Sequence, residues 1–118
     1  MSKSKYYNHP GEVDGYTPPK HENTTNYRLA GKGVLQANNM EIIMGVLGEG
    51  GEAKYHSHAG SEQSIFVLEG SVRVEVGDEV IEVGPDGLIY IPVGVPHRLL
   101  VKEKLRCLVL YSPPLKDW

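Results

Sequence analysis

The sequence predicts one all-β domain whose antiparallel strands form a sandwich or a barrel. Short apolar runs follow one another with a turn signal every several residues, and none has the 3.6-residue periodicity of a helix. At 118 residues the chain can bury one hydrophobic core and does not need a second domain. Evenly spaced short strands with turns between them are typical of both architectures.

The first segment, residues 1–24, is rich in Tyr, Asn, Pro, Gly and His, and Pro18-Pro19 excludes a helix there. We expect it to form an arm that lies on the body of the domain, residues 25–118. Within that body, strands are expected at 26–30, 40–47, 53–56, 64–68, 71–76, 79–83, 88–91, 97–101 and 105–111.

The clearest turn is Gly77-Asp78, because glycine in first place suits a two-residue type II′ hairpin. The strand before it alternates in polarity. Val72, Val74 and Val76 share one face, and the other face carries Ser71, Arg73 and Glu75. An apolar inner face and a polar outer face predict a closed or nearly closed barrel.

Two strands are apolar on both faces, which indicates that both faces are covered. In the strand at 40–47, Ile43 and Leu47 lie on one face and a second apolar set lies on the other. In the strand at 105–111, Leu108 and Leu110 lie on one face, again opposite an apolar set. The opposing sets are Met40, Ile42, Met44 and Val46 in the first strand, and Cys107, Val109 and Tyr111 in the second. The cover can be the arm, a second subunit or both; because symmetric dimers are common, we expect a homodimer.

Charge and composition argue against several kinds of partner and location. A net charge of −3 without a basic block argues against nucleic acid and anionic membranes as partners. No apolar stretch follows the N-terminal lysines and no run reaches the length of a membrane span, so we expect a cytoplasmic protein. The single Cys107 fits a reducing compartment, as a small buried side chain or as a reactive thiol.

His56 and His58 stand one residue apart at the end of an expected strand. Since residues i and i+2 of a strand point the same way, the two imidazoles share one face and can chelate a metal. Alone, this pair is weak evidence for a metal, because two histidines at this spacing also occur on exposed strands.

The residues around the pair narrow the choice. Gly50 precedes His56 at the spacing of a known motif, Gly70 follows Gln63 by seven positions, and Pro92-Val93-Gly94 leads to His97. In these spacings, residues 40–111 resemble the cupin family. The resemblance implies a small β-barrel of the jelly-roll kind and a metal site.

By this resemblance, one divalent transition metal (Fe, Mn, Ni, Zn, Co or Cu) is held by His56, His58, Gln63 and His97. Counting back from Gly70 places Gln63, and not Glu62, at the family's acidic position. Strand parity leaves the two open, because Gln63 would share a face with Ile65 and Glu62 with Phe66, both apolar. A neutral amide leaves the ion its full charge, which favours anionic oxygen ligands.

Two motif positions depart from the family. Asp86 replaces a glycine, for which we expect a modified turn, and Val101 replaces an asparagine. His9 and His21 lie in the arm without partners at chelating spacing, so we expect surface positions for both.

We expect apolar substrate contacts from Met44, Phe66, Leu99 and Val109, with Tyr55 and Tyr90 at the mouth of the pocket, which Tyr27 and Arg28 could also reach. The expected function is a metal-dependent enzyme acting on a small oxygen-rich molecule. It would be a dioxygenase, favoured by the few polar candidates, or an isomerase or lyase working through a metal-bound enolate. The alternative is a non-catalytic module that senses a small ligand or binds a sugar or sugar acid.

Overall fold

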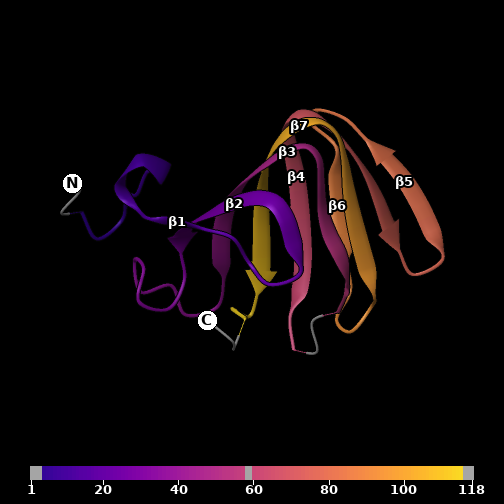
Figure 1. Ribbon diagram of the computed structural model, residues 1–118. Helices are drawn as coiled ribbons and strands as arrows, with labels where there is room; N and C mark the ends of the chain where they lie inside the picture. The colour runs from indigo at the N-terminus through magenta and orange to yellow at the C-terminus, as the bar shows by residue number, and fades with distance from the viewer. Residues whose placement is uncertain (1–3, 58–59, 116–118) are drawn as a thin grey trace.

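The computed structural model describes residues 4–57 and 60–115, and these form an antiparallel β-structure with one short 3-10 helix (Figure 1). The elements are η1 (Pro10–Glu12), β1 (Gly15–Tyr16), β2 (His21–Ala30), β3 (Glu41–His56), β4 (Glu62–Val76), β5 (Glu79–Val83), β6 (Leu88–Ile91) and β7 (His97–Ser112). The sheet order is β1-β2-β3-β7-β4-β5, and β6 pairs with β4. The all-β prediction is confirmed. No helix in this part of the chain has the length and apolar character to cross a membrane.

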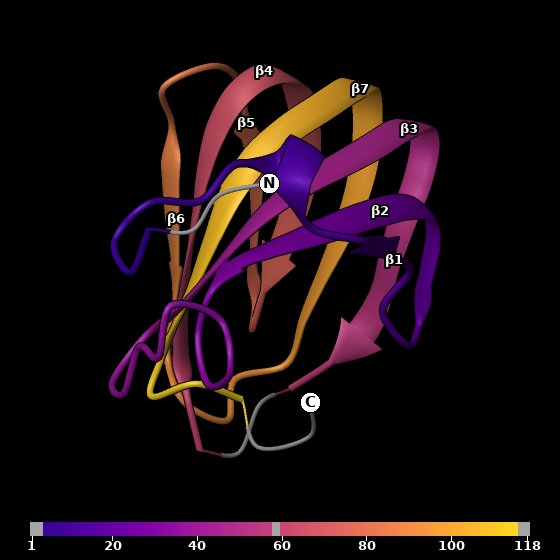
Figure 2. The same ribbon diagram turned by 90° about the vertical axis from the view of Figure 1, so that its left-hand side faces the viewer.

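Three strands are longer than the sequence predicts, because β3, β4 and β7 each run through two of the expected short strands. The pairing of β4 with β7 shifts register between Val67 and Val72, and the pairing of β3 with β7 is interrupted between Leu47 and Glu52. Irregularities of this kind bend and twist a strand. The long strands therefore curve over, and the sheet folds back on itself as a jelly-roll barrel (Figure 2).

The space between the two halves of the folded sheet is filled by one apolar core. Val72 and Val74 of β4 are fully buried, together with Leu105 of β7. The predicted alternation is confirmed, since Arg73 lies on the outer face within 4.0 Å of Glu82. The predicted hairpin is also present: Val76 pairs with Glu79, and Gly77 has a φ of 56°, the sign required at the first turn residue of type II′.

The bend in β4 depends on Gly70, which has a φ of 88°. A Cβ added at Gly70 would collide with the carbonyl oxygen of Lys104. We expect Gly70→Ala to lower the free energy of unfolding by about 3 kcal/mol, measured by urea denaturation.

The matched control is Gly33→Ala, since Gly33 has a similar φ of 79° but open space where its Cβ would lie. This variant suffers only the backbone penalty, about 1 kcal/mol. Equal losses in the two variants would contradict the close approach at Gly70.

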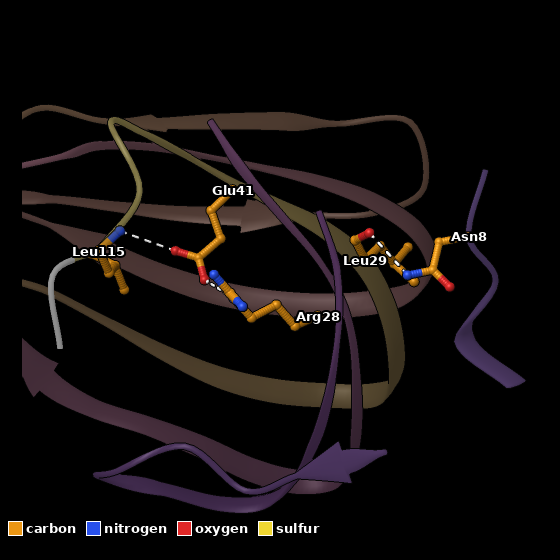
Figure 3. Close-up of polar contacts among 5 residues, drawn as sticks. All are labelled: Asn8, Arg28, Leu29, Glu41 and Leu115. Carbon is orange, nitrogen blue, oxygen red and sulfur yellow. Dashed lines mark hydrogen bonds and ion pairs between the residues drawn. The ribbon is translucent and has the colours of Figure 1, made fainter. Parts of the chain in front are cut away.

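The arm lies on the outer face of the sheet. Pro10, Gly11 and Val13 border a groove of about 390 Å³ whose floor includes Met44 and Val46, and Asn8 Nδ2 donates to the carbonyl oxygen of Leu29 at 3.1 Å (Figure 3). β1 pairs with β2, and β2 runs from His21 across the boundary expected at residue 24.

The cover over this outer face is partial. Leu88 stays 61% exposed and Leu110 37% exposed, whereas Met44, which lies beside the arm, is 9% exposed. The homodimer therefore stays a prediction, and its expected surface is the uncovered part of this face.

One buried ion pair ties three parts of the chain together (Figure 3). Glu41, the first residue of β3, has a side chain with no exposed surface, and its Oε2 accepts from Arg28 Nε of β2 at 2.6 Å. Its Oε1 accepts from the backbone N–H of Leu115, beyond β7, at 3.0 Å. Arg28, a possible pocket-mouth residue from the sequence, is thus held in this structural contact.

Candidate metal centre

A cavity of about 30 Å³ lies inside the barrel, with walls from β2, β3, β4 and β7. This is room for about two water molecules. Its polar lining consists of His21, Asn26, Gln63, His97, Cys107 and Tyr111.

Gln63, the second residue of β4, faces this cavity and is 6% exposed. Its Oε1 is buried and accepts no hydrogen bond from the described part of the chain. Glu62 is exposed and accepts a hydrogen bond from the Tyr90 hydroxyl at 2.7 Å. Of the two neighbours, then, Gln63 faces the interior.

His97, the first residue of β7, is fully buried and lines the same cavity. Its Nδ1 lies 3.0 Å from the carbonyl oxygen of Val95. A carbonyl only accepts, so Nδ1 carries a proton, and whenever the ring is neutral its lone pair lies on the buried Nε2. Backbone carbonyls commonly orient metal-binding imidazoles in this way.

The other two expected ligands are only partly visible. His56 ends β3, and its Cα is the register partner of His97; the placement of its side chain is not described, and His58 lies outside the described residues. In residues 4–57 and 60–115 no three His, Cys, Asp or Glu side chains gather in a group that could hold a metal ion. The structure thus brings together Gln63 and His97 of the expected four, and the buried amide oxygen and imidazole of this pair suit a divalent transition metal.

The charge around the cavity is low. Its described lining contains no Asp, Glu, Lys or Arg. Burial raises the pKa of the Cys107 thiol to about 12, and burial also raises the pKa of the Tyr111 hydroxyl. Without a cation both groups are neutral near pH 7, so the described lining presents no anionic side chain, which favours an anionic oxygen ligand on a bound divalent ion.

The expected substrate contacts divide between the two faces of the sheet. Leu99 and Val109 line the cavity, as expected. Met44 and Phe66 do not, because Gly45 and Ile65 take the interior positions next to them and neighbouring residues of a strand point to opposite faces. Met44 lines the groove under the arm, and Phe66 pairs with Leu88 and Leu108.

Both tyrosines expected at the mouth have exposed side chains. Tyr55 is 47% exposed and Tyr90 is 54% exposed. Tyr90 lies on β6 with its hydroxyl bonded to Glu62, and this hydrogen bond raises the pKa of Tyr90.

His21 is a cavity residue that the sequence failed to predict. It was expected on the surface, but it lines the cavity with Gln63 and His97, and its Nδ1 is buried. The expectation treated residues 1–24 as an arm on the surface, whereas His21 begins β2 and pairs with Ala53 of β3. The register shift between Glu22 and Thr24 then changes the alternation of faces, so that both His21 and Thr24 are turned inward.

The motif glycines have a conformational role. Gly50, Gly70 and Gly94 have φ values of 76°, 88° and 75°, which residues with a Cβ rarely adopt. Asp86, in place of a glycine, has a φ of 71°, and its N–H donates to the carbonyl oxygen of Val67 at 2.8 Å. Aspartate tolerates this conformation, so the departure leaves only the modified turn that was expected.

Comparison with known proteins gives a consistent picture. The family model described as Cupin domain matches residues 43–111. An uncharacterized protein of Streptomyces coelicolor is 33% identical over 81 residues, which are 68% of this chain and 76% of that protein.

Two solved structures extend this similarity to nearly the whole chain. An RmlC-like cupin from Shewanella frigidimarina superposes with a TM-score of 0.82 at 16% identity, covering 99% of this chain and 98% of that one. The polyketide cyclase RemF from Streptomyces resistomycificus superposes with a TM-score of 0.75 at 28% identity, covering 96% of this chain and 80% of that one.

Proposed function

We propose that this chain, which belongs to the cupin family, is a metal-dependent enzyme acting on a small oxygen-rich organic molecule. One divalent transition metal would be held by His56, His58, Gln63 and His97. The observation that carries the proposal is the buried Gln63 Oε1, which accepts no hydrogen bond from the described residues and lines the same cavity as His97, whose Nδ1 is held by Val95. A buried acceptor without a partner costs about 1–3 kcal/mol, and a cation beside it would remove that penalty.

The surrounding residues suit an anionic oxygen ligand. A bound ion would supply Lewis-acid polarisation of a carbonyl or enol oxygen. The described lining offers no carboxylate to compete for the open positions. Leu99 and Val109 restrict water there, which strengthens every electrostatic interaction with the bound molecule.

Two reaction classes fit this site, an oxygenase and a non-oxidative isomerase or lyase. The cavity holds more polar groups than the sequence predicted, since His21, Asn26 and Tyr111 all line it. Hydrogen-bonding groups beside the substrate favour the non-oxidative class. The 28% identity with a protein named as a polyketide cyclase supports the same choice.

The test begins with elemental analysis of protein produced without added metal, where about one equivalent of transition metal per chain is expected. The metal-loaded protein is then assayed on β-diketones, catechols and keto acids, with and without oxygen. Turnover that persists without oxygen supports the isomerase or lyase, whereas turnover with oxygen consumption selects the oxygenase. A protein that binds none of Fe, Mn, Co, Ni, Cu and Zn, and gains no thermal stability from them, contradicts the proposal.

A further inference from the structure

We propose that His21, contributed by the N-terminal segment, contacts the small molecule that binds inside the barrel and helps to select it. This inference rests on the proposed function. It adds a residue outside the expected ligand set, from a part of the chain that precedes the family match at residues 43–111.

The register of the strands places His21 next to the expected metal site. On the inner face, His21 of β2 pairs with Ala53 of β3, which pairs with Leu99 of β7. The neighbouring row along β3 and β7 contains His56 paired with His97. Ala53 has the smallest side chain that carries a Cβ, and the cavity of about 30 Å³ beside it is bordered by both His21 and His97.

The turn before β2 fixes His21 at this position. The His21 N–H donates to the carbonyl oxygen of Pro18 at 3.3 Å, and Lys20 has a φ of 61°. Proline in second place and a positive φ in third place are features of a type II turn, in which the third residue is usually glycine. The Lys20 carbonyl accepts from the Lys54 N–H at 2.9 Å, so a strained residue is anchored to β3 directly before the imidazole enters the barrel.

His21 is one of several polar groups in this lining. Asn26 and Tyr111 are others, and Cys107 is a buried neutral thiol. Leu99 and Val109 offer no polar atom. An imidazole can both donate and accept hydrogen bonds, so His21 suits an oxygen-rich anion that reaches across from the row of His97.

The test uses Co²⁺ as the metal and azide, a three-atom anion, as the probe for the cavity, with binding followed by the visible absorption of cobalt. His21→Phe keeps the ring and removes both nitrogens, and His21→Asn keeps a polar atom near the position of Nδ1. We expect His21→Phe to bind one Co²⁺ as the parent does but to lose about tenfold in azide affinity, the equivalent of one hydrogen bond to a charged group. His21→Asn should recover part of the loss.

The control is His9→Gln, which removes an exposed histidine of the same segment and should leave both affinities unchanged. Equal azide affinity in the parent and a folded His21→Phe or a folded His21→Leu overturns the inference. Loss of Co²⁺ from a folded His21→Phe also overturns it, because His21 would then be a metal ligand. A parent that binds no Co²⁺ contradicts the proposed function, and this inference with it.

Discussion

Replacement of His97 by alanine is expected to reduce metal affinity more than about 100-fold. Loss of a group that only orients a ligand already costs about 10- to 100-fold, and His97 is a proposed ligand that is fully buried, with its ring fixed by Val95. The measurement is metal content after dialysis, followed by competition with a chelator. Unchanged content in a folded His97→Ala would remove His97 from the site.

Variants of Gln63 are expected to change metal affinity less than His97→Ala does, and in both directions. Gln63→Ala should weaken binding less, by about tenfold, because a neutral amide oxygen is a poor donor compared with imidazole. Gln63→Glu should tighten binding, since a carboxylate offsets the charge of the ion in a cavity whose described lining contains no acidic side chain. If Gln63→Glu bound metal more weakly than the parent, Gln63 would not be a ligand.

Arg28→Ala is expected to lower the free energy of unfolding by about 4 kcal/mol, because it leaves a buried carboxylate without its counter-ion. Glu41 has no exposed side-chain surface, and within the described residues its other hydrogen bond comes from the N–H of Leu115. Urea denaturation at neutral pH measures the loss.

Two variants separate this buried charge from a general effect of removing an arginine. Arg106→Ala breaks an ion pair with Glu69 whose side chains are 42% and 65% exposed, and it should cost less than about 1 kcal/mol. The double variant Arg28→Ala/Glu41→Gln should be more stable than Arg28→Ala alone, since it carries no buried charge. A double variant less stable than Arg28→Ala would contradict this explanation.

The fold could be predicted because the signals that produce it, alternating polarity in the strands and glycines at the turns, recur along the chain. The alternation of Val72, Val74 and Val76 with polar residues determines which face of the strand is buried, and Gly77 determines where the hairpin turns. The joining of short strands into long bent ones was not predicted. The sequence marks the bends with Gly50 and Gly70, but a glycine in a strand signals a turn and a bend equally well.

The site was predicted less completely, for a physical reason. Gln63 was placed correctly in the interior by counting from a glycine, where parity left the choice open. Met44 and Phe66 were placed on the wrong face because both faces of their strands are apolar. His21 was missed because residues 1–24 were expected to form a surface arm, and its position at the cavity depends on pairing with Ala53 of β3, which the local sequence does not encode.

The positive φ values of Gly50, Gly70 and Gly94 separate the family pattern into two kinds of position. The glycines preserve the course of the backbone, and the imidazoles and the amide are the proposed metal ligands. Substitution at one kind need not disturb the other, so a descendant could keep its barrel while its histidines diverge. Such a protein would keep the glycine pattern and the barrel of the family but bind a different ligand inside the barrel. Relatives with the same glycines can therefore differ in what they bind.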